Sequence, residues 1–392
     1  MKRRNIMFFS VLCLSVLAGC QQKNTGVVEP ETWKKDHPAQ VEMFQANSEM
    51  SSTTYGGSEP IDYLAKYPYL KTFYEGYGFA IQYDRARGHV YALEDVLSTQ
   101  RPKKGASCLA CKTSEFNEAL MKDKGVSAAN FEEFAEEHVK VGFTCYDCHG
   151  ETPGELDIQR VHIVEAVQQE AVADKIPEKG MACAQCHTEY YMTTDENAVV
   201  LPWESGLGCD EAFAYYESIG FSDWEHPRTG AKLLKAQHPE LETFDGSLHA
   251  SMGLTCTDCH MPEVEVNGEK VSSHHWTSPL KNNIEPACFQ CHKDQGEEGL
   301  KKAVESLQKK VTEKTEDVSL LLEDFINRLA EKKEAGELDE ELLASLQAVH
   351  REAQFYWDYV FVENGEGFHN TDKQMGYLDH AEKLLTEAMK DL

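Results

Sequence analysis

The chain has 392 residues, enough for one large domain or two ordinary ones, and it is strongly acidic, with a formal net charge of −29. This charge excludes nucleic acid as a partner, because another polyanion would be repelled. An anionic substrate would meet the same repulsion, so a site for one would need local positive charge.

The first 19 residues are typical of a targeting segment. Residues 2–4 are basic, and the apolar stretch from Ile6 to Leu17 is too short to span a bilayer comfortably. It ends in Leu17-Ala18-Gly19-Cys20, which resembles a bacterial lipobox and implies cleavage before Cys20 and lipid on its thiol. The alternative is an ordinary cleaved signal. Both readings predict export, with the protein lipid-anchored on the outer face of the cytoplasmic membrane or in the periplasm.

The residues that follow have little regular periodicity. Residues 20–54 are polar and are predicted to be a tether, and residues 55–91 are rich in Tyr, Gly and Pro, which favours irregular segments with short helices. Helical spacing recurs at 131–141 and 158–173. The best hairpin candidate is 264–271, around Asn267-Gly268.

Five CxxC motifs occupy the region 55–295. They are CLACK (Cys108, Cys111), CYDCH (Cys145, Cys148), CAQCH (Cys183, Cys186), CTDCH (Cys256, Cys259) and CFQCH (Cys288, Cys291). The last four are typical of c-type haem attachment, in which two thiols bond the haem vinyl groups and the adjoining His ligates iron. Zinc half-sites or redox pairs are the alternatives, but neither explains a His at one fixed offset four times. The four motif ligands are His149, His187, His260 and His292.

Residues 296–392 have a different character. Apolar residues recur at three- and four-residue steps from Leu300 to Leu329, which predicts a long amphipathic helix. A turn at 334–338 and further helices over 339–362 and 375–389 follow. Intramolecular packing and a homodimer through these helices explain the first stripe equally well. The predicted fold is mainly α, with a haem-packed core, few short strands and long C-terminal helices in one domain with the haem region.

The first motif carries Lys112 where the others carry His. An ammonium cannot bind iron, so Lys112 must be neutral if it is a ligand. An open face opposite it would let substrate bind the iron. Each of the other four haems needs a second axial ligand, and twelve His residues lie outside the motifs. Spacing alone does not say which four serve. Cys209 is left without a partner and is predicted to be an inert buried thiol.

Polar groups stand near three of the motifs. Glu189, Tyr190 and Tyr191 follow His187, the segment KAQH (235–238) precedes the fourth motif, and Arg101 precedes the first. A phenol, an imidazole and a guanidinium are what proton-coupled reduction of a small oxyanion would use.

One CxxCK followed by four CxxCH resembles the pentahaem cytochrome c nitrite reductases, which make ammonium from nitrite. The similarity spans roughly residues 55–380. The family's third haem motif continues as xEYY, matched by Thr188-Glu189-Tyr190-Tyr191. Its KxQH segment is matched by KAQH, and an Arg shortly before CxxCK is matched by Arg101.

The resemblance implies a role for each of these residues. Lys112 would be the proximal ligand of the catalytic haem, with Arg101, Tyr190 and His238 on its distal side. A calcium ion would bind the Glu189 carboxylate, the Gln237 side-chain oxygen and the carbonyls of Tyr190 and Lys235. The distal ligands would be His89 for the third haem, His249 for the fifth and His369 for the fourth. For the second haem, His274 is preferred over His275, although counting from different landmarks favours each.

The implied function is six-electron reduction of nitrite to ammonium, with five haem c groups and one calcium ion. A membrane-bound quinol-oxidising cytochrome would donate the electrons. Three alternatives remain open: an electron-transfer cytochrome without its own substrate site, a multihaem reductase of hydroxylamine or sulfite, and a structural zinc protein.

Overall fold

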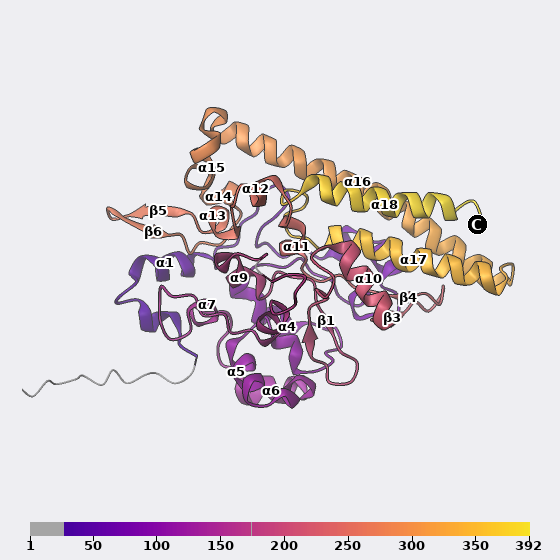
Figure 1. The fold of residues 1–392 in the computed structure, drawn as a ribbon, viewed down its shortest axis with the longest axis horizontal. Helices are drawn as coiled ribbons and strands as arrows, with labels where there is room; N and C mark the ends of the chain where they lie inside the picture. The colour runs from indigo at the N-terminus through magenta and orange to yellow at the C-terminus, as the bar shows by residue number, and fades with distance from the viewer. Residues whose placement is uncertain (1–26, 174) are drawn as a thin grey trace, which may run out of the picture.

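The computed structural model describes residues 27–173 and 175–392, so the expected signal segment and Cys20 lie outside the described residues. The fold is mainly α-helical (Figure 1). The helices, including 3-10 turns (η), are η1 (Pro30–Trp33), α1 (Pro38–Ala46), α2 (Tyr63–Lys66), α3 (Leu70–Phe73), η2 (Gly78–Ala80), η3 (His89–Tyr91), α4 (Ala92–Ser98), η4 (Ala106–Leu109), α5 (Ser114–Lys122), η5 (Lys124–Ala128), α6 (Phe131–His138), α7 (Tyr146–His149), α8 (Val161–Ala166), α9 (Glu178–Ala184), α10 (Cys209–Ile219), α11 (Glu240–Phe244), α12 (Leu248–Ser251), α13 (Cys256–His260), α14 (Pro279–Asn282), α15 (Ile284–His292), η6 (Lys293–Gln295), α16 (Gly296–Ala335), α17 (Glu340–Phe361) and α18 (Thr371–Ala388).

The strands are short and form three antiparallel pairs: β1 (Tyr191–Met192) with β2 (Val199–Val200), β3 (Trp224–Glu225) with β4 (Lys232–Leu233), and β5 (Glu263–Val266) with β6 (Glu269–Ser272). The third pair is the predicted hairpin. Asn267 and Gly268 connect it with φ angles of 54° and 84°, the left-handed conformation that a tight two-residue turn requires.

The long C-terminal helices follow the apolar periodicity. Figure 1 shows α16, α17 and α18 side by side along one edge of the molecule, with the short motif-bearing helices beneath them. Helix α16 ends at Gly336, which adopts a left-handed φ of 69°, and the Asp339 side chain caps α17 by accepting from the Leu342 amide. These local signals place both ends of the α16–α17 turn where the sequence predicts them.

The apolar stripe of α16 has two separate uses. Val311, Val318, Leu322, Phe325 and Leu329 are buried in a core shared with α17 and α18, so intramolecular packing accounts for this part. Leu300, Val304 and Leu307 face the motif-bearing region instead. Leu320 stays more than half exposed.

The same core joins residues 69–74 to the C-terminal helices. Tyr69, Phe73 and Tyr74 pack against α17, where the Phe73 and Trp357 rings lie 4.8 Å apart. The Tyr74 hydroxyl donates to the Asp358 carboxylate, which also pairs with Lys235 at 3.0 Å. The KAQH segment (235–238) is therefore fixed to helix α17 through the Lys235–Asp358 ion pair.

Two expected elements differ from the structure. The tether is folded from residue 28 onward, because helix α1 buries Val41 and Phe44, and the Phe44 ring packs edge-on against Trp276. The helix expected over 158–173 shortens to α8, and turns follow it. Nine residues of α1 are too few for periodicity to predict it among polar neighbours. Among the described residues, no helix has the length and apolar character needed to cross a membrane.

Candidate functional site

A single cavity of about 2580 Å³ runs between the motif-bearing helices. Typical ligand pockets hold roughly 300–1,000 Å³, so this one is sized for several large groups. All ten motif cysteines line it, together with Lys112 and the four motif His residues. Thiols paired with imidazoles along an extended cavity are the donor set that c-type haem requires, so the residues present fit that group. Cys209 lies away from the cavity and is fully buried in α10, as predicted.

Each of the four motif His rings faces a distal His ring across this cavity, and the His187 ring also lies 6.3 Å from that of His238. The ring centroids are separated by 6.2 Å for His149 and His274, 5.8 Å for His187 and His89, 6.2 Å for His260 and His369, and 6.4 Å for His292 and His249. Metal–nitrogen bonds of about 2 Å on both sides place two imidazole centroids roughly 6 Å apart. The structure thus brings together every motif His and the distal His assigned to it. His275 does not line the cavity, whereas His274 does.

Neighbouring motifs contact each other. The Cys111 thiol of the first motif lies 3.9 Å from the Gln185 carbonyl of the third motif, and helix α9, which carries Cys183, packs against α13, which carries Cys256. The third motif therefore lies between the first and the fourth.

The first motif contributes no imidazole pair, because Lys112 stands at its ligand position. Arg101, Tyr190 and His238 line the same cavity. The Arg101 guanidinium lies 4.2 Å from the Phe79 ring centroid, and its Nε donates to the Thr99 hydroxyl at 3.2 Å. This stacking holds the side chain in place without neutralising its charge.

Burial keeps His238 and Tyr190 uncharged. It lowers the pKa of His238 to about 4, although the nearby Glu240 carboxylate acts in the opposite direction. Burial likewise raises the pKa of Tyr190 well above its usual value, and the nearby Cys111 adds to this effect. The buried Nδ1 of His238 has no hydrogen-bond partner among the described residues. An imidazole with a free nitrogen and a phenol are thus available to a molecule in the cavity.

Three of the four predicted calcium-ligating residues contact one another: Glu189, Gln237 and Lys235. The fully buried Glu189 carboxylate accepts from the Gln237 backbone N–H at 2.7 Å and from the Tyr216 hydroxyl at 2.9 Å. The Gln237 side-chain Nε2 donates to the Lys235 carbonyl at 3.0 Å. A carboxylate, an amide and a backbone carbonyl are the oxygen donors that calcium prefers, so this set fits the ion. No contact links the Tyr190 carbonyl to the others in the described residues.

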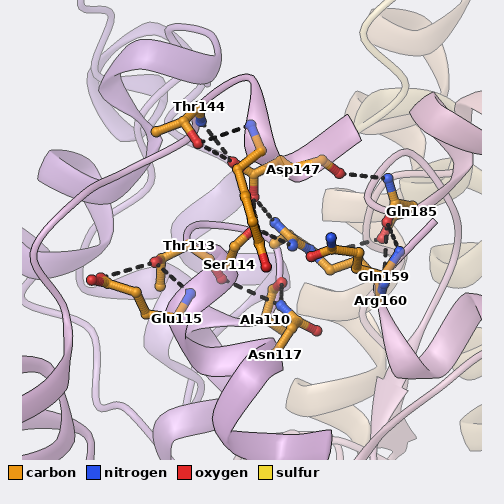
Figure 2. Close-up of polar contacts among 12 residues, drawn as sticks. Ala110, Thr113, Ser114, Glu115, Asn117, Thr144, Asp147, Gln159, Arg160 and Gln185 are labelled. Carbon is orange, nitrogen blue, oxygen red and sulfur yellow. Dashed lines mark hydrogen bonds and ion pairs between the residues drawn. The ribbon is translucent and has the colours of Figure 1, made fainter. Parts of the chain in front are cut away.

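A buried polar network joins the first three motifs (Figure 2). The Arg160 guanidinium pairs with the Asp147 carboxylate, and both are about 1% exposed. The Ser114 hydroxyl donates to Asp147 at 2.6 Å and accepts from Arg160 at 3.0 Å. The Gln185 side chain donates to the Asp147 carbonyl at 3.0 Å. Asp147 and Gln185 both precede the second cysteine of their motifs, so the network fixes the spacing of these attachment sites.

Sequence reasoning missed this network and the carboxylates beside two of the His pairs. Asp147 and Gln185 occupy the variable positions of CxxC, where no chemical rule selects a residue. Glu240 stands two residues after His238, and Glu363 stands six before His369. An acidic residue beside a candidate His ligand is a usable signal, because ligating imidazoles commonly donate to carboxylates.

Comparison with known proteins agrees with this geometry. The family model described as cytochrome c552 matches residues 29–392. The cytochrome c nitrite reductase subunit NrfA of Nitratidesulfovibrio vulgaris is 31% identical over 95% of this chain and 82% of its own length. Cytochrome c-552 of Porphyromonas gingivalis is 30% identical over 86% of this chain and 71% of its own length. The solved cytochrome c nitrite reductase NrfA from Desulfovibrio desulfuricans, whose catalytic subunit has two calcium sites, matches with a TM-score of 0.85 at 29% identity, over 93% of this chain and 87% of that one.

Proposed function

The chain belongs to the cytochrome c552 family, and from this membership and the site geometry we propose that it reduces nitrite to ammonium. The observation that carries the proposal is the contrast among the five motifs. Four present facing imidazole pairs, and the first presents Lys112 beside Arg101, Tyr190 and His238. Four motifs therefore suit electron transfer, and one suits substrate.

The reaction converts one nitrite, six electrons and eight protons into one ammonium ion and two waters. Bound haem c groups, five in all, would carry the electrons, and the iron at Lys112 would bind the substrate nitrogen. Arg101 would hold the anion by a charge-assisted hydrogen bond. His238 and Tyr190, uncharged at neutral pH, would supply protons to the oxygens that leave as water.

Calcium would act beside this pocket. Glu189, Gln237 and the carbonyls of Lys235 and Tyr190 would hold it, and Gln237 directly precedes His238. Burial raises the pKa of the Glu189 carboxyl well above its usual value and so favours its protonated form. The positive charge of the ion would oppose this effect and keep Glu189 ionised. Together with Arg101 it would concentrate positive potential for nitrite in an otherwise acidic protein.

The remaining assignments concern location and partners. The lipobox at Cys20 would anchor the protein to the membrane, beside a quinol-oxidising cytochrome that supplies electrons.

The exposed Leu320 on α16 offers a position for a homodimer through the C-terminal helices. Light scattering of the wild type and of Leu320→Glu tests the dimer, since a charge inside an apolar interface weakens it.

The central experiment measures ammonium formed per nitrite consumed, using haem-loaded protein and a reduced viologen dye. A ratio near one is expected. Untouched nitrite with all haems reduced would instead identify an electron-transfer protein, and turnover of hydroxylamine or sulfite alone would identify a different reductase.

The Tyr190→Phe variant should lose nitrite reductase activity. The neighbouring variant Tyr191→Phe should retain it, because the Tyr191 hydroxyl bonds Tyr215 at 2.9 Å.

A further inference from the structure

The paired imidazoles differ in what their outward ring nitrogen contacts. Three of them contact backbone carbonyls through Nδ1: His149 that of Glu155 at 2.7 Å, His274 that of Ser272 at 2.9 Å and His260 that of Thr277 at 3.3 Å. His187 and His369 contact carboxylates instead. The neutral and charged acceptors are therefore distributed unequally among the four pairs.

Glu363 is the acceptor for His369. Its carboxylate is about 1% exposed and hydrogen-bonds His369 Nδ1 through Oε1, which also accepts from the Gly365 amide at 2.9 Å. Its Oε2 accepts from the Gln374 side chain at 3.0 Å. A Cβ at Gly365 would lie 2.6 Å from His369 Nδ1, so only glycine lets the backbone pass this close to the ring. Both carboxylate oxygens are thus fixed, and the ring is held against one of them.

Glu240 lies beside His187 at ion-pair distance, without the hydrogen bond that Glu363 makes to His369, so its effect on the ligand comes through its charge. Its Oε2 lies 3.4 Å from His187 Nδ1, and the carboxylate is about 9% exposed. Its Oε1 accepts from the Asn364 amide at 3.2 Å and from the Asn364 side chain. Because Asn364 follows Glu363, one short loop after α17 orients both carboxylates.

The charge of such an acceptor changes the ligand. An imidazole that donates its N–H to a carboxylate becomes a stronger electron donor toward a metal than one that donates to a carbonyl. A buried negative charge also stabilises the more positive, oxidised state of a nearby iron. Both effects lower the reduction potential.

We propose that Glu240 and Glu363 are positioning residues that lower the reduction potentials of the haems ligated by His187 and His369, relative to the haem ligated by His149. The proposal rests on the haem ligation put forward above and not on the identity of the substrate. The third motif contacts the first through Gln185 and Cys111, and it contacts the fourth through the packing of α9 against α13. The haem ligated by His187 would therefore lie beside the Lys112 site, with the haem ligated by His369 next to it, so both would stand on a route by which electrons reach the substrate.

The test is a spectroelectrochemical titration of the haem-loaded protein with Glu363→Gln and Glu240→Gln. Each variant should shift one haem transition to higher potential by at least a tenfold change in its reduction equilibrium, about 59 mV for one electron. Electron paramagnetic resonance should show altered g values for the same haem. The control is Glu155→Gln, which removes a negative charge near His149 but leaves the backbone carbonyl that the ring contacts. It should leave every transition unchanged.

Unshifted transitions in both variants, or equal shifts in the control, would overturn the proposal. If Glu363→Gln does not fold, Gln374→Leu provides an independent reading. Without the Gln374 hydrogen bond, more negative charge stays on the Glu363 carboxylate, so the same haem should shift to lower potential. An unshifted potential in this variant would also contradict the proposal. Haem content and nitrite turnover of the wild type separate the two proposals: a loaded, active enzyme with unmoved potentials rejects this inference alone.

Discussion

The imidazole rings of His149 and His274 face each other with centroids 6.2 Å apart, whereas His275 turns its ring to the Asn282 side chain. The His274 carbonyl accepts from the Asn47 side chain at 2.8 Å, so the segment after α1 helps to orient this residue. We expect His274→Asn to convert one haem from low spin to high spin, because its sixth ligand is lost. Absorbance and electron paramagnetic resonance spectra report this change.

The matched control is His275→Asn. It removes the same group from the adjacent residue outside the cavity, and it should leave the low-spin signal intact. The reverse pattern would assign His275 as the ligand.

Removal of calcium should lower nitrite turnover, and Glu189→Gln should weaken calcium binding by at least roughly tenfold, because the only charged donor of the set is lost. Calorimetric titration of chelator-treated protein measures the affinity. The neighbouring Glu242 is the control: burial raises its pKa to about 8, so it is neutral near pH 7, and Gln replaces it with little change in charge. Equal calcium affinities for Glu189→Gln and the wild type would remove Glu189 from the site.

The Arg160–Asp147 pair should show strong coupling. Arg160→Met leaves a buried carboxylate unpaired and should cost roughly 3–5 kcal/mol of unfolding free energy. Adding Asp147→Asn removes that charge, so the double variant should be less destabilised than the two single variants summed. Urea unfolding followed by circular dichroism measures each stability.

The exposed pair Arg328–Asp324 provides the comparison. Arg328→Met should cost less than about 1 kcal/mol, because solvent screens both charges. Similar costs at the two sites would mean that the buried network contributes no more than a surface pair.

Stability should also fall on acidification through His350. This fully buried ring lies between the Thr229 hydroxyl at 3.1 Å and the Gln354 side chain at 3.0 Å, and burial, aided by the positive charge of His226, lowers its pKa to about 3. Because the folded pKa lies below that of the unfolded chain, protonation favours unfolding. The loss begins as pH falls below about 6.5, reaches about 2 kcal/mol at pH 5 and continues to about pH 3.

The variant His350→Asn should flatten the dependence of unfolding free energy on pH between 7 and 5. Thr229→Val removes a partner of the ring but keeps the titrating group, so it should lower stability and keep the slope. Parallel curves for wild type and His350→Asn would show that this histidine does not contribute to acid sensitivity.

The sequence predicts those features that depend on residues close together in the chain. The C-terminal helices follow from local periodicity and caps, and the structure confirms them from Leu300 to Met389 with small shifts at the ends. The hairpin at 264–271 follows from Asn267-Gly268 for the same reason.

The distal His residues carry no local signal, since residues 89, 249, 274 and 369 come from distant parts of the chain and meet their partners only in the folded state. The resemblance supplied them, and spacing did not. Glu240 and Glu363 were missed because acidic residues are common in this chain. Only the folded structure shows that these two contact the imidazole rings of His187 and His369. Helix α1 was missed because only Val41 and Phe44 reach the body from a polar stretch.

The contact between Phe73 and Trp357 has a consequence for biosynthesis. In a chain exported from its N-terminus, as proposed above, residues 108–292 with every attachment motif would leave the translocation channel before α17. The aromatic residues at 69–74 must wait for α17 to complete their core. Haem attachment would therefore meet thiols that are still accessible, and the last helices would complete the core afterwards.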